Sequence, residues 1–125
     1  PRADYISPIK DALKAGLNVT SHHDAPVTFP NAMRVLDATV NRVTKSGKIL
    51  GPDQRLSPFD GLKTLTIWAA YQYFEEDKKG TITTNKYADF VILDKNPIKI
   101  DPLEIHNIKI VEAIRRGKSV YKHNN

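Results

Sequence analysis

The feature that most constrains the fold is residues 19–27, where a short apolar run leads into two histidines, an aspartate and a proline. The β-branched residues predict a strand, which ends near Ala25-Pro26 because proline has no N–H to continue a ladder. Side chains alternate along a strand, so His22 and Asp24 would project to one side and His23 to the other. The pattern predicts a His/carboxylate pair at the C-terminal end of a strand, where barrel enzymes place catalytic groups.

The same residues have a second interpretation, which involves no chemistry. An aspartate ahead of Ala-Pro is typical of turns and helix caps, and adjacent histidines often lie at the surface. Because so short a motif is only a hypothesis, the choice between the two interpretations depends on the rest of the chain.

The composition is ordinary for a soluble globular domain, with 125 residues, 40% hydrophobic and 26% charged. No apolar run approaches the roughly 18 residues of a membrane span, and the N-terminus has no signal-peptide pattern. We therefore expect a cytoplasmic protein. Because the chain has no cysteine, a metal site would need histidine and carboxylate ligands.

The net charge of +5 could favour a nucleic acid or another polyanion as a partner. The basic residues are scattered, however, and no aromatic residues are interleaved with the densest groups, residues 78–79 and 115–118. We expect these side chains to form a solvated surface, with neither nucleic acid nor membrane as a partner.

The first 79 residues predict helices separated by one short strand. Apolar residues recur at helical spacing, Gly16 stands where a C-terminal cap belongs, and Ser57-Pro58 is typical of a helix start. The expected segments are a helix over residues 3–15, a strand over 17–20, a helix over 31–43, a surface loop over 44–54 and a helix over 57–74. Helix, short link and strand in that order indicate an α/β fold.

From residue 80 onward the sequence is strand-like, which places a domain boundary between residues 79 and 80. Residues 80–83 and 90–93 are rich in β formers, and the second run is apolar on both faces, as expected for a strand covered from both sides. Residues 108–114 and 119–122 flank a turn that predicts a hairpin, with Gly117 at the position that needs a positive φ.

Together these landmarks resemble the C-terminal part of the metal-dependent amidohydrolase superfamily, in particular amidohydrolase family 3. The matching stretches cover nearly the whole chain in the expected order. They are SHHDAPV (21–27), VNRVTKSG (40–47), SPFDGLKTLTIWAAY (57–71), GTITTNKYADFVILD (80–94) and RGKSVY (116–121).

The resemblance implies a (β/α)8 TIM barrel whose metal site lies at the C-terminal ends of the strands, together with a small β-sandwich. Residues 1–79 would supply the last strand and helices of the barrel, with residues 17–23 as its eighth strand. Residues 80–125 would supply the C-terminal strands of the β-sandwich.

The resemblance also implies roles for single residues. Asp24 matches the eighth-strand aspartate that binds the metal and carries a proton from the attacking water to the leaving amine. His22 would stand in the wall of the substrate pocket, while His23 would face away from the metal. His106 and His123 would lie in the sandwich with no site around them.

The family's other metal ligands have no counterpart in the sequence. A divalent metal, zinc by the resemblance, normally needs three or four protein ligands, and Asp24 with His22 cannot complete such a set. We therefore expect a fragment that is inactive alone. Its intact parent would hydrolyse non-peptide C–N bonds of a small amide-type substrate.

A second hypothesis is a catalytically dead structural or interaction module. Removing the preceding strands of a barrel would leave edges and apolar faces uncovered. Under either hypothesis we expect the chain to self-associate or to assemble with the rest of its parent.

Overall fold

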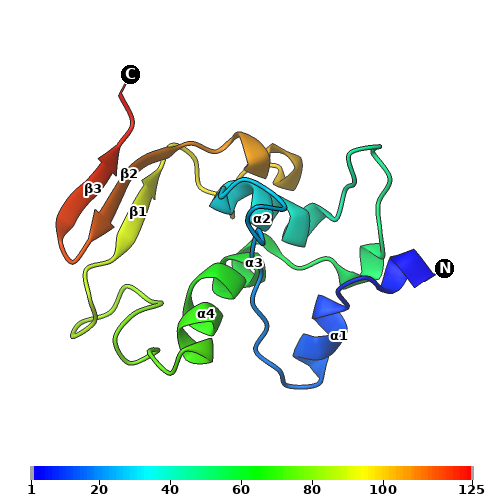
Figure 1. Cartoon of the computed structure of the whole chain (residues 1–125), viewed down its shortest axis with the longest axis horizontal. Coiled ribbons are helices and arrows are strands. Elements are labelled where there is room, and N and C mark those ends of the chain that lie inside the picture. Colours follow the sequence, from blue (N-terminus) through cyan, green and yellow to red (C-terminus); the bar gives the residue numbers. More distant parts are fainter. Residues whose placement is uncertain (1, 125) are drawn as a thin grey trace.

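The computed structural model describes residues 2–124, in which all α-helices precede residue 80 and all strands follow it (Figure 1). The elements are the 3-10 helices η1 (Arg2–Tyr5), η2 (Pro52–Gln54) and η3 (Pro102–Asn107), the α-helices α1 (Ile9–Lys14), α2 (Ala32–Asn41), α3 (Pro58–Leu65) and α4 (Ile67–Gln72), and the strands β1 (Phe90–Leu93), β2 (Ile110–Arg115) and β3 (Lys118–Lys122). The expected α/β composition is therefore present. In this described part of the chain, no helix is long and apolar enough to cross a membrane.

Helix α2 is the central element and forms where the sequence predicts it. The Asn31 side chain caps its N-terminus by accepting a hydrogen bond from the backbone N–H of Arg34. The helix ends at Arg42, whose left-handed backbone takes the place of the usual C-terminal glycine. Its buried face carries the side chains of Met33, Val35, Leu36, Thr39 and Val40.

The main hydrophobic core lies between α2, α3 and η3. Leu36 and Ile105 are completely buried, and each contributes about 2 kcal/mol through removal of its side chain from water. Helix α3 approaches α2 closely at Gly61, where an added Cβ would lie only 2.8 Å from Cδ1 of Leu36. The lack of a side chain at Gly61 therefore allows the two helices to pack this closely.

The predicted helix over residues 57–74 begins as expected but is divided in two. Ser57 caps α3 by accepting from the N–H of Asp60, and Pro58 occupies the first turn. The break lies at Thr66, whose hydroxyl donates to the carbonyl of Leu62 at 2.8 Å. Such hydrogen bonding back to the preceding turn competes with the backbone and bends helices, which accounts for the interruption.

The predicted helix over residues 3–15 is also interrupted, forming η1 and α1 with a break before Pro8. Proline has no N–H to donate and its ring crowds the preceding turn, so α1 starts after it. Gly16, with φ of 82°, ends the helical region as predicted. The expected strand that follows is absent, because residues 17–23 form no ladder with another strand.

The three strands form an antiparallel sheet in the order β1-β2-β3. The hairpin prediction is confirmed: Arg115 pairs with Lys118, and the two turn residues Arg116 and Gly117 both have positive φ. A two-residue turn of this type matches the twist of the flanking strands.

Two predictions about the β-rich part of the chain are wrong. Residues 80–83 form no strand. Strand β1 is not covered from both sides, since Val91 and Ile92 are 51% and 42% exposed. The physical reason is that no second layer packs on the sheet among the described residues, and Leu93 alone of β1 reaches the main core.

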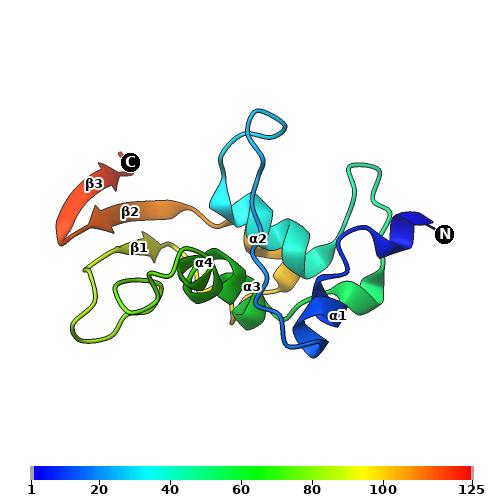
Figure 2. The same ribbon diagram turned by 60° about the horizontal axis from the view of Figure 1, so that its bottom comes forward.

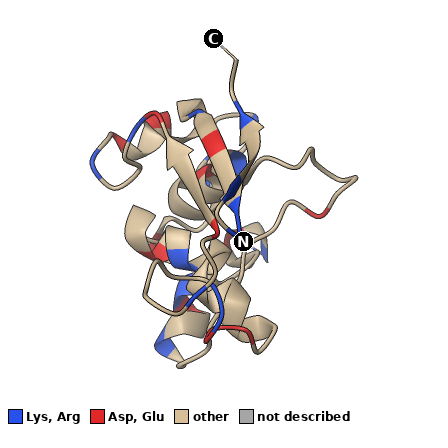
Figure 3. Ribbon diagram, turned by 90° about the vertical axis from the view of Figure 1, so that its left-hand side faces the viewer, with Lys and Arg blue, Asp and Glu red and all other residues tan. Residues whose placement is uncertain are grey.

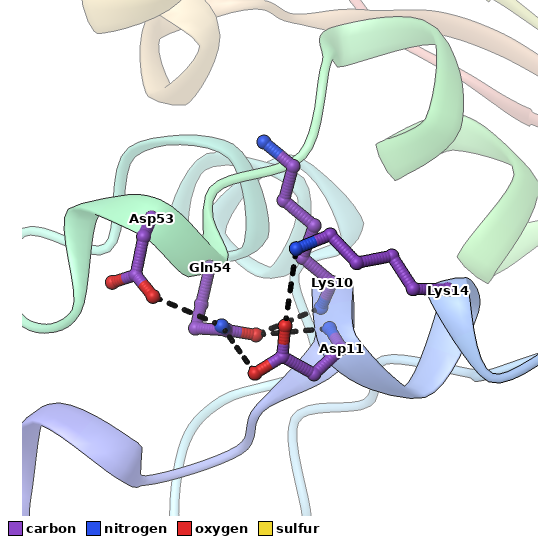
Figure 4. A network of polar contacts seen from close by, with 5 residues as sticks. All are labelled: Lys10, Asp11, Lys14, Asp53 and Gln54. Atoms are coloured by element: carbon purple, nitrogen blue, oxygen red, sulfur yellow. Dashed lines mark hydrogen bonds and ion pairs between the residues drawn. The ribbon is translucent and has the colours of Figure 1, made fainter.

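The loop between α2 and α3 holds α1 in place through Gln54, which is almost completely buried (Figure 4). Its Oε1 accepts hydrogen bonds from the backbone N–H groups of Lys10 and Asp11, both at 3.1 Å. Its Nε2 donates to the carboxylates of Asp11 and Asp53. Pro8, the N-cap residue of α1, has no side chain that can cap the helix, so Gln54 supplies this cap from a distant loop.

We predict that Gln54→Leu destabilises the protein by about 2 kcal/mol, because two helical N–H groups lose their acceptor in a buried place. Chemical denaturation followed by circular dichroism measures this change. Asp53→Ala is the matched control, since Asp53 is exposed and makes only one of these contacts. Equal stabilities of the Gln54→Leu variant and the wild type would show that Gln54 does not hold α1.

Candidate functional site

Residues 17–23 run between the helices as an extended segment rather than as a barrel strand. The backbone N–H of Ser21 donates to the carbonyl of Thr64 at 3.4 Å, and the Ser21 hydroxyl lies 2.9 Å from Oγ1 of Thr39. The Thr20 hydroxyl donates to Oε1 of Gln72 at 3.0 Å. Because its described neighbours are helices α2, α3 and α4, the segment has no strand with which to pair, and the strand prediction is wrong for this reason.

The segment ends in a loop that precedes α2 in the chain and projects away from the helices, as the light-blue loop at the top of Figure 2 shows. Asp24 stands in this loop with a positive φ of 52°, and its carbonyl accepts from the N–H of Val27 at 2.8 Å. The backbone N–H of Asp24 donates to Nδ1 of His22 at 3.1 Å. The structure therefore places Asp24 in an exposed turn, which agrees with the turn interpretation of its local sequence.

This contact with Asp24 fixes the tautomer of neutral His22. Since Nδ1 accepts a hydrogen bond, the ring proton is on Nε2, and His22 presents an N–H donor to its surroundings. In this arrangement neither ring nitrogen has a free lone pair for a metal. The role of pocket wall thus fits the geometry of His22 better than the role of ligand.

His22 and His23 both line an open hollow of about 970 Å³ between the projecting loop, α2 and the start of α1. Asp24 is not among the residues that line it. The alternation predicted for His22 and His23 assumed the regular pleat of a strand, which this segment does not form. Nδ1 of His23 is buried without a hydrogen-bond partner in the described structure.

The residues present do not fit a metal site by themselves. Within residues 2–124 no group of three or more histidine, aspartate or glutamate side chains could hold an ion. Asp24 and His22 are exposed neighbours, and His106 instead lies 3.8 Å from Asp37 of α2. The metal-binding role of Asp24 therefore stays a prediction that needs donors from outside this chain.

Sequence reasoning missed the basic side chains of the hollow, which are Arg34, Arg42 and Lys45. Arg34 and Ala38 lie on α2, and Asn31 and Arg42 are its two cap residues, so that the four lining residues follow at spacings of three or four. This spacing was visible in the sequence, but its significance depends on the projecting loop that forms the opposite wall. Elsewhere basic and acidic residues are interspersed over the molecule, as Figure 3 shows and as the sequence predicted.

Comparisons with known proteins agree with the resemblance seen in the motifs. The sequence model described as the amidohydrolase family matches residues 1–121. An N-substituted formamide deformylase of Arthrobacter pascens is 24% identical over 117 residues, which cover 94% of this chain and 22% of that protein. An imidazolonepropionase of Streptococcus sanguinis is 33% identical over 96 residues, which cover 76% of this chain and 21% of that protein.

Two further similarities concern a second amidohydrolase sequence and a solved fold. The putative amidohydrolase YtcJ of Bacillus subtilis is 24% identical over 116 residues, covering 90% of this chain and 22% of that protein. The crystal structure of an amidohydrolase from Thermotoga maritima superposes with a TM-score of 0.68 at 22% identity, covering 91% of this chain and 25% of that chain. The chain thus spans about a fifth of the length of these curated relatives. Because the amidohydrolase family's sequence model matches nearly the whole of this chain, the chain belongs to the amidohydrolase family.

Proposed function

We propose that this chain forms part of a metal-dependent hydrolase that cleaves C–N bonds other than peptide bonds in small amide-type molecules. Membership of the amidohydrolase family supports a hydrolase acting on C–N bonds. The observation that carries the proposal is the position of Asp24, directly after a segment anchored to three helices and next to the hollow that His22 lines.

In this proposal Asp24 is the group that moves the proton. Its carboxylate takes a proton from the water molecule whose oxygen attacks the carbonyl carbon of the substrate. It then gives this proton to the nitrogen as the C–N bond breaks, so that the carboxylate is regenerated. The Nε2–H of His22 is available to donate a hydrogen bond to substrate in the hollow.

The proposed hydrolase uses a metal ion, but this chain alone does not supply enough ligands to bind it. A divalent ion, with zinc as our choice, lowers the pKa of bound water and so supplies the nucleophile near neutral pH. Asp24 would contribute one ligand, and the remaining ligands would come from protein outside this chain. We accordingly propose that the chain alone is inactive and works when assembled with such a partner, in the cytoplasm.

A second candidate function is a catalytically dead module that self-associates. The observation that favours it is the exposure of large apolar side chains, which reaches 90% for Phe29, 87% for Phe74 and 86% for Ile82. Side chains of this kind gathered at an interface would bury apolar area on association. The two candidates differ in whether Asp24 has any chemical role.

We predict that the isolated chain binds zinc with a dissociation constant above about 10 μM, because Asp24, even with His22 released from its hydrogen bond, cannot complete a tetrahedral site. Isothermal titration calorimetry at neutral pH measures this affinity, and a His22→Ala, Asp24→Ala double variant serves as the control. One zinc ion held tightly and lost in the double variant would contradict the proposed incomplete site.

We predict that Asp24→Asn lowers kcat of the assembled hydrolase at least about 100-fold, since the amide keeps the shape of the side chain but cannot carry the proton. Release of amine or ammonia from amide substrates measures the rate. Asp77→Asn is the control, because Asp77 is an exposed carboxylate outside the hollow. A fully active Asp24→Asn variant would show that Asp24 is not the general acid/base.

A further inference from the structure

The Arg and Lys side chains that line the hollow beside His22 have no acidic side chain among them. Its basic side chains are Arg34, Arg42 and Lys45, and no aspartate or glutamate is among the residues that line it. We propose that this hollow binds a small organic anion through a carboxylate or a phosphate group. Such a group would replace the water that solvates the three cations and accept charge-assisted hydrogen bonds from them.

Three hydrogen bonds to backbone carbonyls hold the guanidinium of Arg42 in a fixed orientation at the hollow. Its Nε donates to the carbonyl of Leu50 at 2.6 Å, and its two terminal nitrogens donate to the carbonyls of Ser7 and Ile6 at 3.1 and 2.5 Å. A guanidinium has five N–H groups, so two remain after these three bonds. The bonds fix the plane of the guanidinium and thereby reduce the entropy lost when an anion binds.

Arg34 adds a second positive charge to the wall of the hollow; it lies on α2, whereas Arg42 is the residue that ends this helix. Two lysines on other helices have a carboxylate partner on the same helix: Lys14 lies 3.4 Å from Asp11 on α1, and Lys63 lies 2.9 Å from Asp60 on α3. No such ion pair involves Arg34 or Lys45 within the described residues.

The acid of α2 does not neutralise this face. Asp37 accepts a hydrogen bond from Asn41 at 2.7 Å and lies 3.8 Å from His106, and it is not among the residues lining the hollow. The basic face of α2 therefore keeps its charge.

The polar groups of the walls also match an acceptor rather than a donor. Two acceptors of the walls are already used, Nδ1 of His22 by the Asp24 N–H and Oδ1 of Asn31 by the Arg34 N–H. The Nε2–H of His22 and the cationic side chains remain available as donors. An anion satisfies these donors, whereas a metal cation would meet repulsion from them.

The anion site rests on the charges and hydrogen bonds of the hollow alone. Its assignment to a substrate rests on the proposed function: Asp24 lies two residues after His22, so the substrate would be an amide that carries its anionic group away from the bond that is cleaved. The size of the hollow, about 970 Å³, is sufficient for a small organic molecule.

The test is a titration of the complete 125-residue chain at low salt, followed by amide chemical shifts in heteronuclear NMR. The probes are glutarate, inorganic phosphate and the neutral diamide glutaramide. We expect saturable shifts at residues of the hollow with glutarate or phosphate and none with glutaramide. The tighter of the two anions identifies the group that the hollow prefers.

A double variant Arg34→Gln, Lys45→Gln should weaken anion binding about tenfold or more, because two charge-assisted contacts are lost. The matched control Lys99→Gln, Lys109→Gln removes the same charge from exposed positions outside the hollow and should bind as wild type. Circular dichroism checks that both variants keep the fold.

Equal weakening in both double variants, or shifts spread over the whole basic surface, would overturn the anion site. Binding of glutaramide as tight as that of glutarate would do the same. The two proposals can fail separately. If the chain binds anions but the assembled protein hydrolyses no amide, the anion site stands and the proposed function is wrong. If the assembled protein hydrolyses amides but the hollow binds no anion, the proposed function stands and the anion site is wrong.

Discussion

Helix α2 has two faces with different partners, and the main hydrophobic core depends on one face and the hollow on the other. The apolar face packs against α3 and η3 through Leu36, Val40 and Ile105, with Gly61 allowing the close approach of α3. The other face lines the hollow and contacts the extended segment through Thr39. At its end, Arg42 donates to three carbonyls and so ties the N-terminal residues to the loop before η2. Loss of α2 would therefore remove the core and the candidate site together.

The parts of the fold that the sequence predicted are those with local physical causes. The start of α2 depends on an asparagine cap, the start of α3 on Ser57 and Pro58, and the hairpin on Arg116-Gly117, all of which act over a few residues. The parts that failed depend on distant neighbours. Residues 17–23 have strand-like residues but no strand beside them, and β1 is apolar on both faces but has no covering layer within residues 2–124.

The same contrast between local and distant causes applies to the residues of the candidate site. The motif around Asp24 was visible because it is continuous in sequence, whereas the basic hollow joins side chains of α2 to a loop that precedes it. The structural role of Gln54 could not be predicted, because a single glutamine in a polar loop has the sequence pattern of a surface residue. Its role becomes evident only from its hydrogen bonds to the start of α1. Its burial shows that the loop is an ordered part of the fold.

Strand β3 and the side chains of Phe29, Phe74 and Ile82 remain exposed, and we propose that a second copy or another protein covers them. Sedimentation velocity of the purified chain between about 1 and 100 μM tests this claim most directly, since association governed by mass action depends on concentration. We predict a sedimentation coefficient that rises with concentration as copies associate through these faces. A single monomeric species across the whole range, with cooperative unfolding, would contradict the account, because it would show that the chain completes its own core.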